Sequence, residues 1–228
     1  MRLGEYVEIL NYVDDTAAAG AYYEKLGLAP LGGDVYTDGR YHLHLITGSG
    51  PNPSLRYFGS DLDALRESGL DIVDGTLTSP AGVHILLSAD PPPRELPHDN
   101  VARAQDITRL GKFGELSAFI PDLEVECAFW EAAGYDVLGK YTMPSPWGIW
   151  CDKLFLIGLH QDDVDEPFAI CHFAPDMKEV NGQLIAEGFD LQPFESGDLP
   201  ADLTYQKLMT PFGILFYLFT GDISDANP

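Results

Sequence analysis

The stretch VEILNYVDDTAAAGAYYEKLGL, residues 7–28, decides the fold of this chain. Its first seven residues are mostly β-branched or otherwise apolar and predict a strand. Asp15 then predicts the N-cap of a helix, and Gly27 predicts its end. Four apolar residues between them follow helical spacing: Ala19, Tyr22, Tyr23 and Leu26. The segment is therefore predicted to be a strand followed directly by a helix.

The same pattern returns 107 residues further along the chain, in GELSAFIPDLEVECAFWEAAGY, residues 114–135. Its first seven residues again predict a strand, Asp122 predicts the helix cap, and Gly134 predicts the helix end. Phe129 and Trp130 take the places of the two tyrosines. A repeat of this length, with the same residue types at matched positions, indicates an internal duplication.

Two weaker copies complete the pattern. One has Asp61 as its predicted cap and Gly69 as its predicted end, and the other has Asp176 and Gly188. Each helix is followed by short predicted strands, and both weaker copies carry a similar turn before the last strand, Ser-Pro-Ala-Gly or Thr-Pro-Phe-Gly. The sequence therefore predicts an α+β protein of four βαβββ units, at residues 4–50, 53–89, 112–163 and 166–221.

The four units are predicted to form two domains, residues 1–89 and residues 112–222. Residues 90–111 join them. The prolines of this linker exclude regular structure over its first part, and VARAQDITRL at its end predicts a short helix. Two arrangements of the units are open: unit 1 with 2 and 3 with 4, or unit 1 with 4 and 2 with 3.

Charge and cysteine content narrow the class of protein. The chain has 13 Lys and Arg against 36 Asp and Glu, a net charge of −23. Nucleic acid is not an expected partner, because its phosphates bind clustered basic residues. There is no apolar run of membrane-spanning length, so no membrane association is expected. The three cysteines form no metal or disulfide motif, and we expect a cytoplasmic protein.

The four βαβββ units, with their Asp caps, aromatic pair, Gly ends and Ser-Pro-Ala-Gly turn, resemble the vicinal oxygen chelate superfamily. This superfamily includes glyoxalase I, bleomycin-resistance proteins and extradiol dioxygenases. The resemblance implies two glyoxalase-like domains with concave mixed sheets. In the enzymes of the family, it implies a divalent metal held by the first and fourth strands of the odd unit and the first and last strands of the even unit. Because the duplication supplies both partners of the pairing, we expect a monomer.

The resemblance identifies two candidate residues in each odd unit. Glu8 and Glu115 lie seven residues before the caps of their units, at the first-strand position. His44 and His160 lie in the strands that correspond to the fourth strand. These four residues are candidate ligands of a metal or of a small molecule. The structural alternative is that Glu8 and Glu115 only accept hydrogen bonds within the concave sheet and that His44 or His160 is a hydrogen-bonded histidine of the core.

The even units depart from the family pattern. The expected His is replaced by Ser54 and Ala169, and the expected Glu by Leu86 and Tyr217. A catalytic metal site usually has about three protein ligands, and either arrangement of the units leaves two. We therefore expect no metal and no cofactor. A one-residue slip that turns Cys171 or the following histidine inward remains the alternative.

The segment YTMPSPWGIW, residues 141–150, is aromatic and proline-containing. It lies between the second and third predicted strands of unit 3. Trp147 and Trp150 are expected either to cover the mouth of a cavity or to pack on the other half of the molecule. In the first reading they surround one ligand site in the second domain together with Glu115 and Tyr217.

The leading hypothesis is a small-molecule binding protein resembling the bleomycin-resistance proteins. Aromatic side chains and a negative field favour an aromatic or cationic ligand, bound without a metal. Two alternatives remain. One is a metal-dependent lyase, isomerase or dioxygenase, and the other is a pseudoenzyme that serves as an interaction scaffold. Whether the chain catalyses any reaction is open at this stage.

Overall fold

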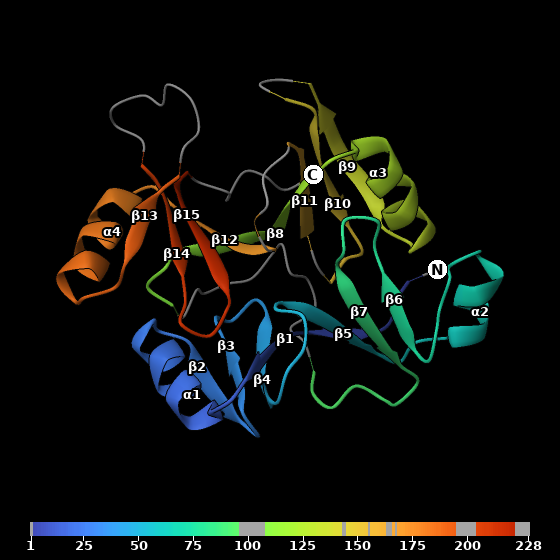
Figure 1. Cartoon of the computed structure of the whole chain (residues 1–228), viewed down its shortest axis with the longest axis horizontal. Coiled ribbons are helices and arrows are strands. Elements are labelled where there is room, and N and C mark those ends of the chain that lie inside the picture. Colours follow the sequence, from blue (N-terminus) through green and yellow to red (C-terminus); the bar gives the residue numbers. More distant parts are fainter. Residues whose placement is uncertain are drawn as a thin grey trace.

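The structure, a computed structural model, consists of two mixed β-sheets accompanied by helices (Figure 1). The α+β class predicted from the sequence is confirmed. Two parts of the sequence analysis lie outside the described residues. One is Met143, in the aromatic segment 141–150, and the other is residues 96–107, which include most of the predicted connecting helix. The description covers residues 2–95, 108–142, 145–154, 156–162, 166, 168–194 and 204–221.

Sheet A is formed by the first half of the chain, and the described residues give it seven strands in the order β2-β3-β4-β1-β5-β7-β6. Strand β1 is parallel to β4 and antiparallel to β5. The elements are β1 (Tyr6–Val13), α1 (Thr16–Lys25), β2 (Ala29–Gly32), β3 (Val35–Thr37), β4 (His42–Thr47), β5 (Ser54–Phe58), α2 (Leu62–Glu67), β6 (Thr76–Thr78) and β7 (His84–Ser88).

Sheet B is formed by the second half, and the described residues give it eight strands in the order β13-β14-β15-β12-β8-β11-β10-β9. Strand β8 is parallel to β11 and antiparallel to β12. The elements are β8 (Lys112–Ile120), α3 (Leu123–Ala132), β9 (Asp136–Tyr141), β10 (Trp147–Cys151), β11 (Leu156–Gln161), β12 (Ala169–Ala174), α4 (Met177–Ala186), β13 (Leu191–Pro193), β14 (Tyr205–Met209) and β15 (Leu215–Thr220). Hydrogen-bonded sheets therefore join unit 1 with 2 and unit 3 with 4.

The ends of the helices bear out the 107-residue repeat. The carboxylates of Asp15 and Asp122 each accept hydrogen bonds from the backbone N–H groups two and three residues further on. Gly27 and Gly134 both have left-handed backbones, with φ of 97° and 90°. A side chain would be strained in that conformation, which explains why glycine ends both helices.

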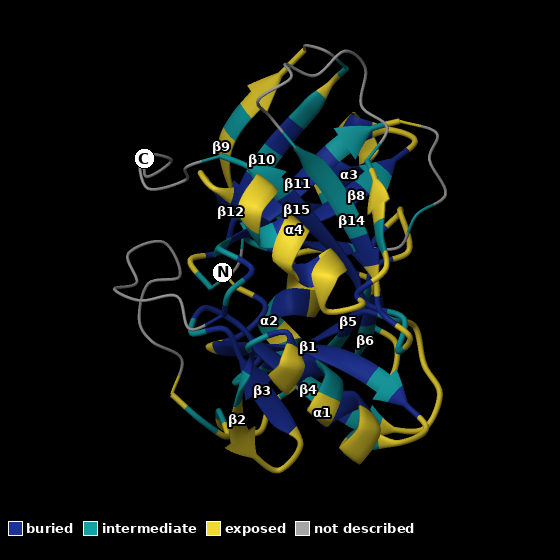
Figure 2. Ribbon diagram, turned by 90° about the vertical axis from the view of Figure 1, so that its left-hand side faces the viewer, coloured by how far each residue is buried: buried dark blue, intermediate teal, exposed yellow. Residues whose placement is uncertain are grey.

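Alternation along the strands gives each sheet two different faces. In β1, Val7 and Ile9 face the helices and share the main hydrophobic core with Ala19 and Tyr23 of α1. Residues of the other parity, such as Glu8, face the opposite way. Within the described residues no helix packs on this second face, which is called the helix-free face below. Figure 2 shows that the central strands are buried while the outer sides of the helices are exposed.

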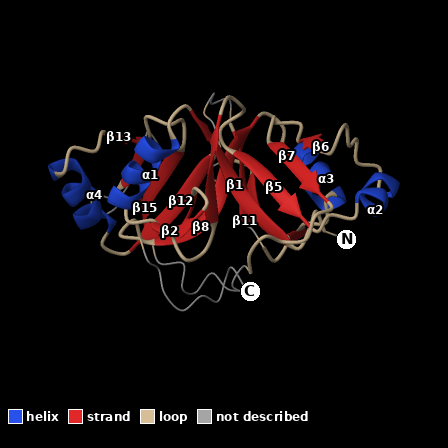
Figure 3. Ribbon diagram, turned by 90° about the horizontal axis from the view of Figure 1, so that it is seen from below, coloured by secondary structure: helices blue, strands red, loops and turns tan. Residues whose placement is uncertain are grey.

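Unit 1 lies beside unit 4, although the two belong to different sheets. The side-chain amide of Asn11 donates a hydrogen bond of 2.8 Å to the carbonyl of Phe212, in the Thr-Pro-Phe-Gly turn between β14 and β15. The ring of Phe212 also packs on Tyr22 and Tyr23 of α1. In Figure 3, α1 and α4 accordingly lie at one end of the molecule and α2 and α3 at the other.

Unit 2 lies beside unit 3 in the same way. The Glu126 carboxylate, on α3, accepts hydrogen bonds from the hydroxyl of Ser79 at 2.5 Å and from the backbone N–H of Ala81 at 3.2 Å. These two residues belong to the Ser-Pro-Ala-Gly turn between β6 and β7. The hydroxyl oxygens of Tyr57 and Tyr135 lie 2.5 Å apart in the buried interface of the same two units. Both arrangements considered for the units are thus present, one through hydrogen-bonded strands and one through packing.

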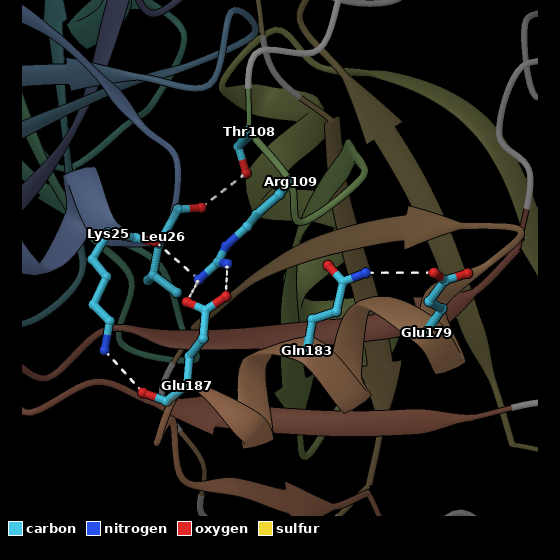
Figure 4. Close-up of polar contacts among 7 residues, drawn as sticks. All are labelled: Lys25, Leu26, Thr108, Arg109, Glu179, Gln183 and Glu187. Atoms are coloured by element: carbon cyan, nitrogen blue, oxygen red, sulfur yellow. Dashed lines mark hydrogen bonds and ion pairs between the residues drawn. The ribbon is translucent and has the colours of Figure 1, made fainter.

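The segment that leads into β8 is fixed between α1 and α4 (Figure 4). The Arg109 guanidinium donates to both carboxylate oxygens of Glu187, at 2.6 and 2.8 Å, and to the backbone carbonyl of Lys25 at 3.0 Å. The Lys25 ammonium donates in turn to the Glu187 carbonyl at 3.0 Å.

None of the described helices combines the length and apolar character needed to cross a bilayer.

Candidate functional site

The helix-free face of sheet A carries a chain of hydrogen bonds between β1 and β4. The Tyr6 hydroxyl donates to Glu8 Oε1 at 2.9 Å and lies 2.7 Å from His42 Nδ1. The second oxygen of Glu8 lies 2.8 Å from His44 Nδ1. Glu8 is 1% exposed, so its charge is stabilised mainly by these neighbours.

The ionised form of Glu8 is favoured in this setting. Burial raises the pKa of Glu8, but the hydrogen bond and the charge of His44, the hydrogen bond from Tyr6 and the charge of Arg56 oppose burial, and the pKa is lowered overall. Arg56 lies directly across from Glu8 in the antiparallel pair β1–β5. One Glu8 oxygen is hydrogen-bonded to Tyr6 and the other to His44, so both are engaged with protein groups.

The helix-free face of sheet B brings Glu115 and His160 together less closely, with 3.6 Å between Glu115 Oε1 and His160 Nε2. The Glu115 carboxylate lies directly over Gly158 of β11, where it occupies the space that a side chain would fill. Cys171 of β12 lies across from Glu115. Burial, and then the charge of Glu115, raise the pKa of the Cys171 thiol well above its usual range, so the thiol stays protonated.

His44 and His160 are not equivalent, which corrects the alignment made from the sequence. In the parallel pairing of β4 with β1, His44 lies beside Leu10. The counterpart of Leu10 in β8 is Ser117, and Ser117 lies beside Gly158. His160 lies two residues further along β11, because the extra residues before this strand shift the alignment.

Sheet B also carries a second hydrophobic cluster, separate from the main core and on the helix-free face. Its buried members are small or apolar except for one tyrosine, and its partly exposed members are all phenylalanines. They are Ala169, Cys171, Leu215 and Tyr217, with Phe119, Phe173, Phe194 and Phe219 packed against them. The cluster places Tyr217 beside aromatic rings from three different segments, with centroid distances of 6.4 Å to Phe119, 5.0 Å to Phe194 and 5.4 Å to Phe219.

The two tryptophans of β10 point to opposite faces of sheet B, so the expectation that they surround one cavity is wrong. Trp147 is partly exposed and stacks on His160, with 5.6 Å between ring centroids and 6° between ring planes. It also stacks on Tyr141 at 4.2 Å. Trp150 is 0% exposed and belongs to the main core. The reason is strand alternation, because a separation of three residues reverses the face.

Glu166 and Lys207 were missed by the sequence analysis. The Tyr217 hydroxyl donates to Glu166 Oε2 at 2.6 Å, and Lys207 of β14 forms an ion pair with the other oxygen. Burial raises the pKa of Glu166, but the hydrogen bonds from Lys207 and Tyr217 outweigh burial and lower it. Glu166 precedes β12 by three residues, and no periodic pattern marks it.

The donor set does not fit a metal ion. Within the described ranges, no three His, Cys, Asp or Glu side chains are grouped as metal ligands. In sheet A both oxygens of Glu8 already accept hydrogen bonds, and Arg56 adds a positive charge beside them. In sheet B, Cys171 is a protonated thiol, and the following histidine, His172, is buried on the other face near Asp38.

Comparison with protein-family models and with curated proteins gave no match. Solved structures do match over most of the chain. The Mn(II)-bound glyoxalase from Novosphingobium aromaticivorans is 17% identical with a TM-score of 0.59, over 93% of this chain and 80% of that one.

Two dioxygenases are similar to the same extent. A catechol 2,3-dioxygenase is 14% identical with a TM-score of 0.58, over 97% of this chain and 94% of that one. An extradiol ring-cleaving dioxygenase from B. fuscum is 14% identical with a TM-score of 0.60, over 100% of this chain and 74% of that one. The chain thus shares its fold with these glyoxalase and dioxygenase structures, as the resemblance predicted.

Proposed function

We propose that the chain binds a planar aromatic small molecule on the helix-free face of sheet B, without a metal. The observation that carries this proposal is a row of aromatic rings across this face. Neighbouring rings lie 4.2 to 6.4 Å apart by their centroids. In order, the row consists of Tyr141, Trp147, His160, Phe119, Tyr217 and Phe219.

Partial exposure distinguishes this row from a core. Phe119, Phe194 and Phe219 are only partly buried, whereas the aromatic residues of the main core, such as Trp130 and Trp150, have no exposed surface. Exposed aromatic surface is costly in water, and a planar ligand that stacks on it removes that cost. The ring of Phe194 lies nearly parallel to that of Phe119, at 6.2 Å between centroids and 22° between planes, which supports stacking as the mode of contact on this face.

Charge favours a ligand with a cationic group. Glu115 lies beside His160, in the aromatic row, and the whole chain carries a net charge of −23. A negative field raises the local concentration of cations, and ring faces attract them as well. A planar cation therefore fits this face better than a planar anion of the same size.

Tryptophan fluorescence tests the proposal. Trp130 and Trp150 are fully buried, so a ligand on the face is expected to act mainly on Trp147. We expect the planar cation proflavine to quench fluorescence saturably and 2-naphthoate to bind more weakly. Phe119→Ala should weaken proflavine binding by roughly 1–3 kcal/mol, about 5- to 150-fold, the usual value for one stacked ring.

The duplication supplies a matched control. Tyr12 occupies in β1 the position that Phe119 occupies in β8, on the helix-free face of the other sheet. Tyr12→Ala should leave proflavine binding unchanged. If Phe119→Ala binds proflavine as tightly as the parent does, or if Tyr12→Ala weakens binding equally, the aromatic row is not the site.

A metal-dependent enzyme is the second candidate, and the comparisons favour it, because the similar structures are described as an Mn(II)-bound glyoxalase and dioxygenases. Such a site would have to use Glu115 and His160. Elemental analysis of the purified protein after dialysis separates the two candidates. About one equivalent of manganese, iron, nickel or zinc per chain, lost in Glu115→Ala, would replace the first proposal with the second.

A further inference from the structure

We propose that the contact between Asp38 and His172 is a pH-sensitive latch between units 1 and 4, closed by a second proton on His172 that sets a buried imidazolium against a buried carboxylate. Asp38 lies in the turn between β3 and β4, and His172 lies in β12. The contact is on the opposite face of β12 from Cys171 and the aromatic row, so it is independent of the proposed ligand site.

The duplication builds this contact twice, once at each junction between the sheets. Asp38 follows β3 and Asp152 follows β10, at matched positions in the pairing of these strands with β4 and β11. Tyr57 of β5 and His172 of β12 are likewise matched through their pairing with β7 and β15. Asp152 of unit 3 meets Tyr57 of unit 2, and Asp38 of unit 1 meets His172 of unit 4. The two junctions therefore differ in the partner of an equivalent aspartate.

The junction of units 2 and 3 uses a partner that does not change its charge. The Tyr57 hydroxyl donates to Asp152 Oδ2 at 3.0 Å and lies 2.5 Å from the hydroxyl oxygen of Tyr135. Burial, and then the charge of Asp152, raise the pKa of Tyr57 well above its usual range. The tyrosine therefore keeps its proton and its hydrogen bond across the neutral and mildly alkaline range.

The junction of units 1 and 4 has an ion-pair distance instead of a hydrogen bond. Asp38 Oδ2 lies 3.4 Å from His172 Nε2, and the two side chains are 1% and 0% exposed. Among the described residues, neither Asp38 Oδ2 nor either ring nitrogen of His172 has a hydrogen-bond partner. The other oxygen, Oδ1, accepts from the backbone N–H groups of Arg40 and Tyr41, at 2.6 and 2.9 Å, which favours the carboxylate form. A second proton on His172 places an opposite charge directly against this carboxylate.

Aromatic rings around His172 can stabilise that charge. The ring centroids of Tyr41, Phe113 and Phe216 lie 6.0, 6.2 and 5.8 Å from the centroid of the imidazole. They come from three segments, the turn between β3 and β4, β8 and β15. Because the face of an aromatic ring attracts a cation, these rings and the carboxylate together form an environment suited to an imidazolium.

His172 is the member of this environment that can change its charge near neutral pH. Burial, and then the charge of Asp38, raise the pKa of Tyr41 well above its usual range, so Tyr41 stays neutral. Burial also raises the pKa of Tyr23, which α1 presents to the same junction. Arg40, buried in the turn beside Asp38, stays charged throughout. The residues that β8 and β15 contribute are phenylalanines, which do not titrate.

The direction of the pH effect follows from where the proton is held. The closed junction keeps the second proton on His172, and opening exposes the ring to water, where the proton is lost more readily. Raising the pH therefore favours the open junction, and the contribution of the contact is complete at low pH. The contact between Tyr57 and Asp152 is unaffected over the same range, so opening is confined to units 1 and 4.

Nitrogen-15 NMR of the histidine rings in the intact chain is the first test. We expect both ring nitrogens of His172 to be protonated at a pH of about 7.5, where an exposed histidine is about 90% neutral. Asp38→Asn should make His172 neutral at that pH. Asp152→Asn, the equivalent change at the other junction, should leave it charged. A neutral His172 in the parent at this pH would overturn the proposal, because the closing charge would be missing.

Amide hydrogen exchange is the second test, because it follows each junction separately. The Tyr41 N–H is bonded to Asp38 Oδ1, and the Leu154 N–H is bonded to Asp152 Oδ1 at 2.8 Å. Protection factors, which correct for the pH dependence of exchange itself, are measured between pH values of about 7 and 9. That of Tyr41 should fall by up to about tenfold for each pH unit over which His172 loses its proton. That of Leu154 should stay constant.

Two variants complete the exchange experiment. His172→Gln should make the protection of Tyr41 independent of pH. Tyr57→Phe should lower the protection of Leu154 equally at every pH and leave the pH response of Tyr41 intact. Circular dichroism checks that each variant is folded, and the series on the parent decides the question even if one is not. The latch is ruled out if Tyr41 protection in the parent does not change with pH, if both junctions lose protection together, or if folded His172→Gln responds as the parent does.

Discussion

A single residue decides how the two equivalent glutamates are used. Glu8 and Glu115 lie at the same position of duplicated strands, but His44 stands beside the first and Gly158 beside the second. Glu8 therefore accepts a hydrogen bond of 2.8 Å from an adjacent imidazole, whereas Glu115 turns over the glycine toward His160 at 3.6 Å. The sequence predicted that each glutamate would meet a histidine. It did not predict the register that makes the two pairs different.

Gly158→Ala tests this role of the glycine. The new methyl group would meet the Glu115 carboxylate, which is the flexible end of a side chain and can move aside. We expect Glu115 to leave His160, seen as a changed chemical shift of the His160 ring nitrogens. The free energy of unfolding should change by less than about 1 kcal/mol.

Gly182→Ala is the matched control for that substitution. Gly182 lies inside α4 with open space where an added Cβ would lie, so alanine there should raise stability by about 0.5–1 kcal/mol through helix propensity. It should leave the His160 resonances unchanged. An unchanged His160 signal in Gly158→Ala would show that Glu115 does not depend on the glycine.

At the scale of elements, local sequence signals were enough to predict where the helices begin and end. They were not enough to predict which face of the sheet each strand residue occupies. Asp15 and Gly27 mark the ends of a helix because capping and left-handed geometry depend on neighbouring atoms alone. Trp150 was assigned to the ligand site although alternation from Trp147 turns it to the core. Glu166 was missed because its role comes from Tyr217, a residue far along the chain.

The turn between β6 and β7 depends on α3 through Glu126, and this contact gives a pH dependence. Burial raises the pKa of Glu126, against the opposing hydrogen bonds from Ser79 and Ala81. A carboxyl group whose pKa is higher in the folded chain stabilises the fold when it is protonated. That contribution is complete below the unfolded value near 4.5 and is lost as the pH rises through the folded pKa.

Glu126→Gln should remove this dependence while it keeps a side chain able to bond to the turn. Urea unfolding of parent and variant between pH values of about 4 and 8 provides the measurement. The variant should gain stability relative to the parent as the pH rises, by about 1 kcal/mol for each unit by which the pKa is raised. A difference that stays constant across this range would mean that Glu126 titrates normally.

The whole molecule is held together by packing that crosses between the sheets. Phe212 of unit 4 lies against Tyr22 and Tyr23 of unit 1, and the main core contains residues from both halves. The position of each helix-free face therefore depends on both halves, although the hydrogen bonds of each sheet stay within one. The duplication was readable from the sequence because it repeats local patterns. The contacts between units 1 and 4 were not, because no local pattern encodes them.

A continuous core predicts that the two halves unfold together. All three tryptophans belong to the second half, at positions 130, 147 and 150, so fluorescence follows sheet B, while the NMR signals of His44 follow sheet A. Both signals should give the same urea midpoint.

Phe212→Ala should lower both midpoints together and cost about 2 kcal/mol, because Phe212 is partly buried against α1. Ile185→Ala, at a side chain that is 56% exposed, should change stability by less than about 0.5 kcal/mol. Two separate midpoints, or a Phe212→Ala effect confined to fluorescence, would mean that the sheets are stable independently and that the aromatic row can be studied in an isolated half.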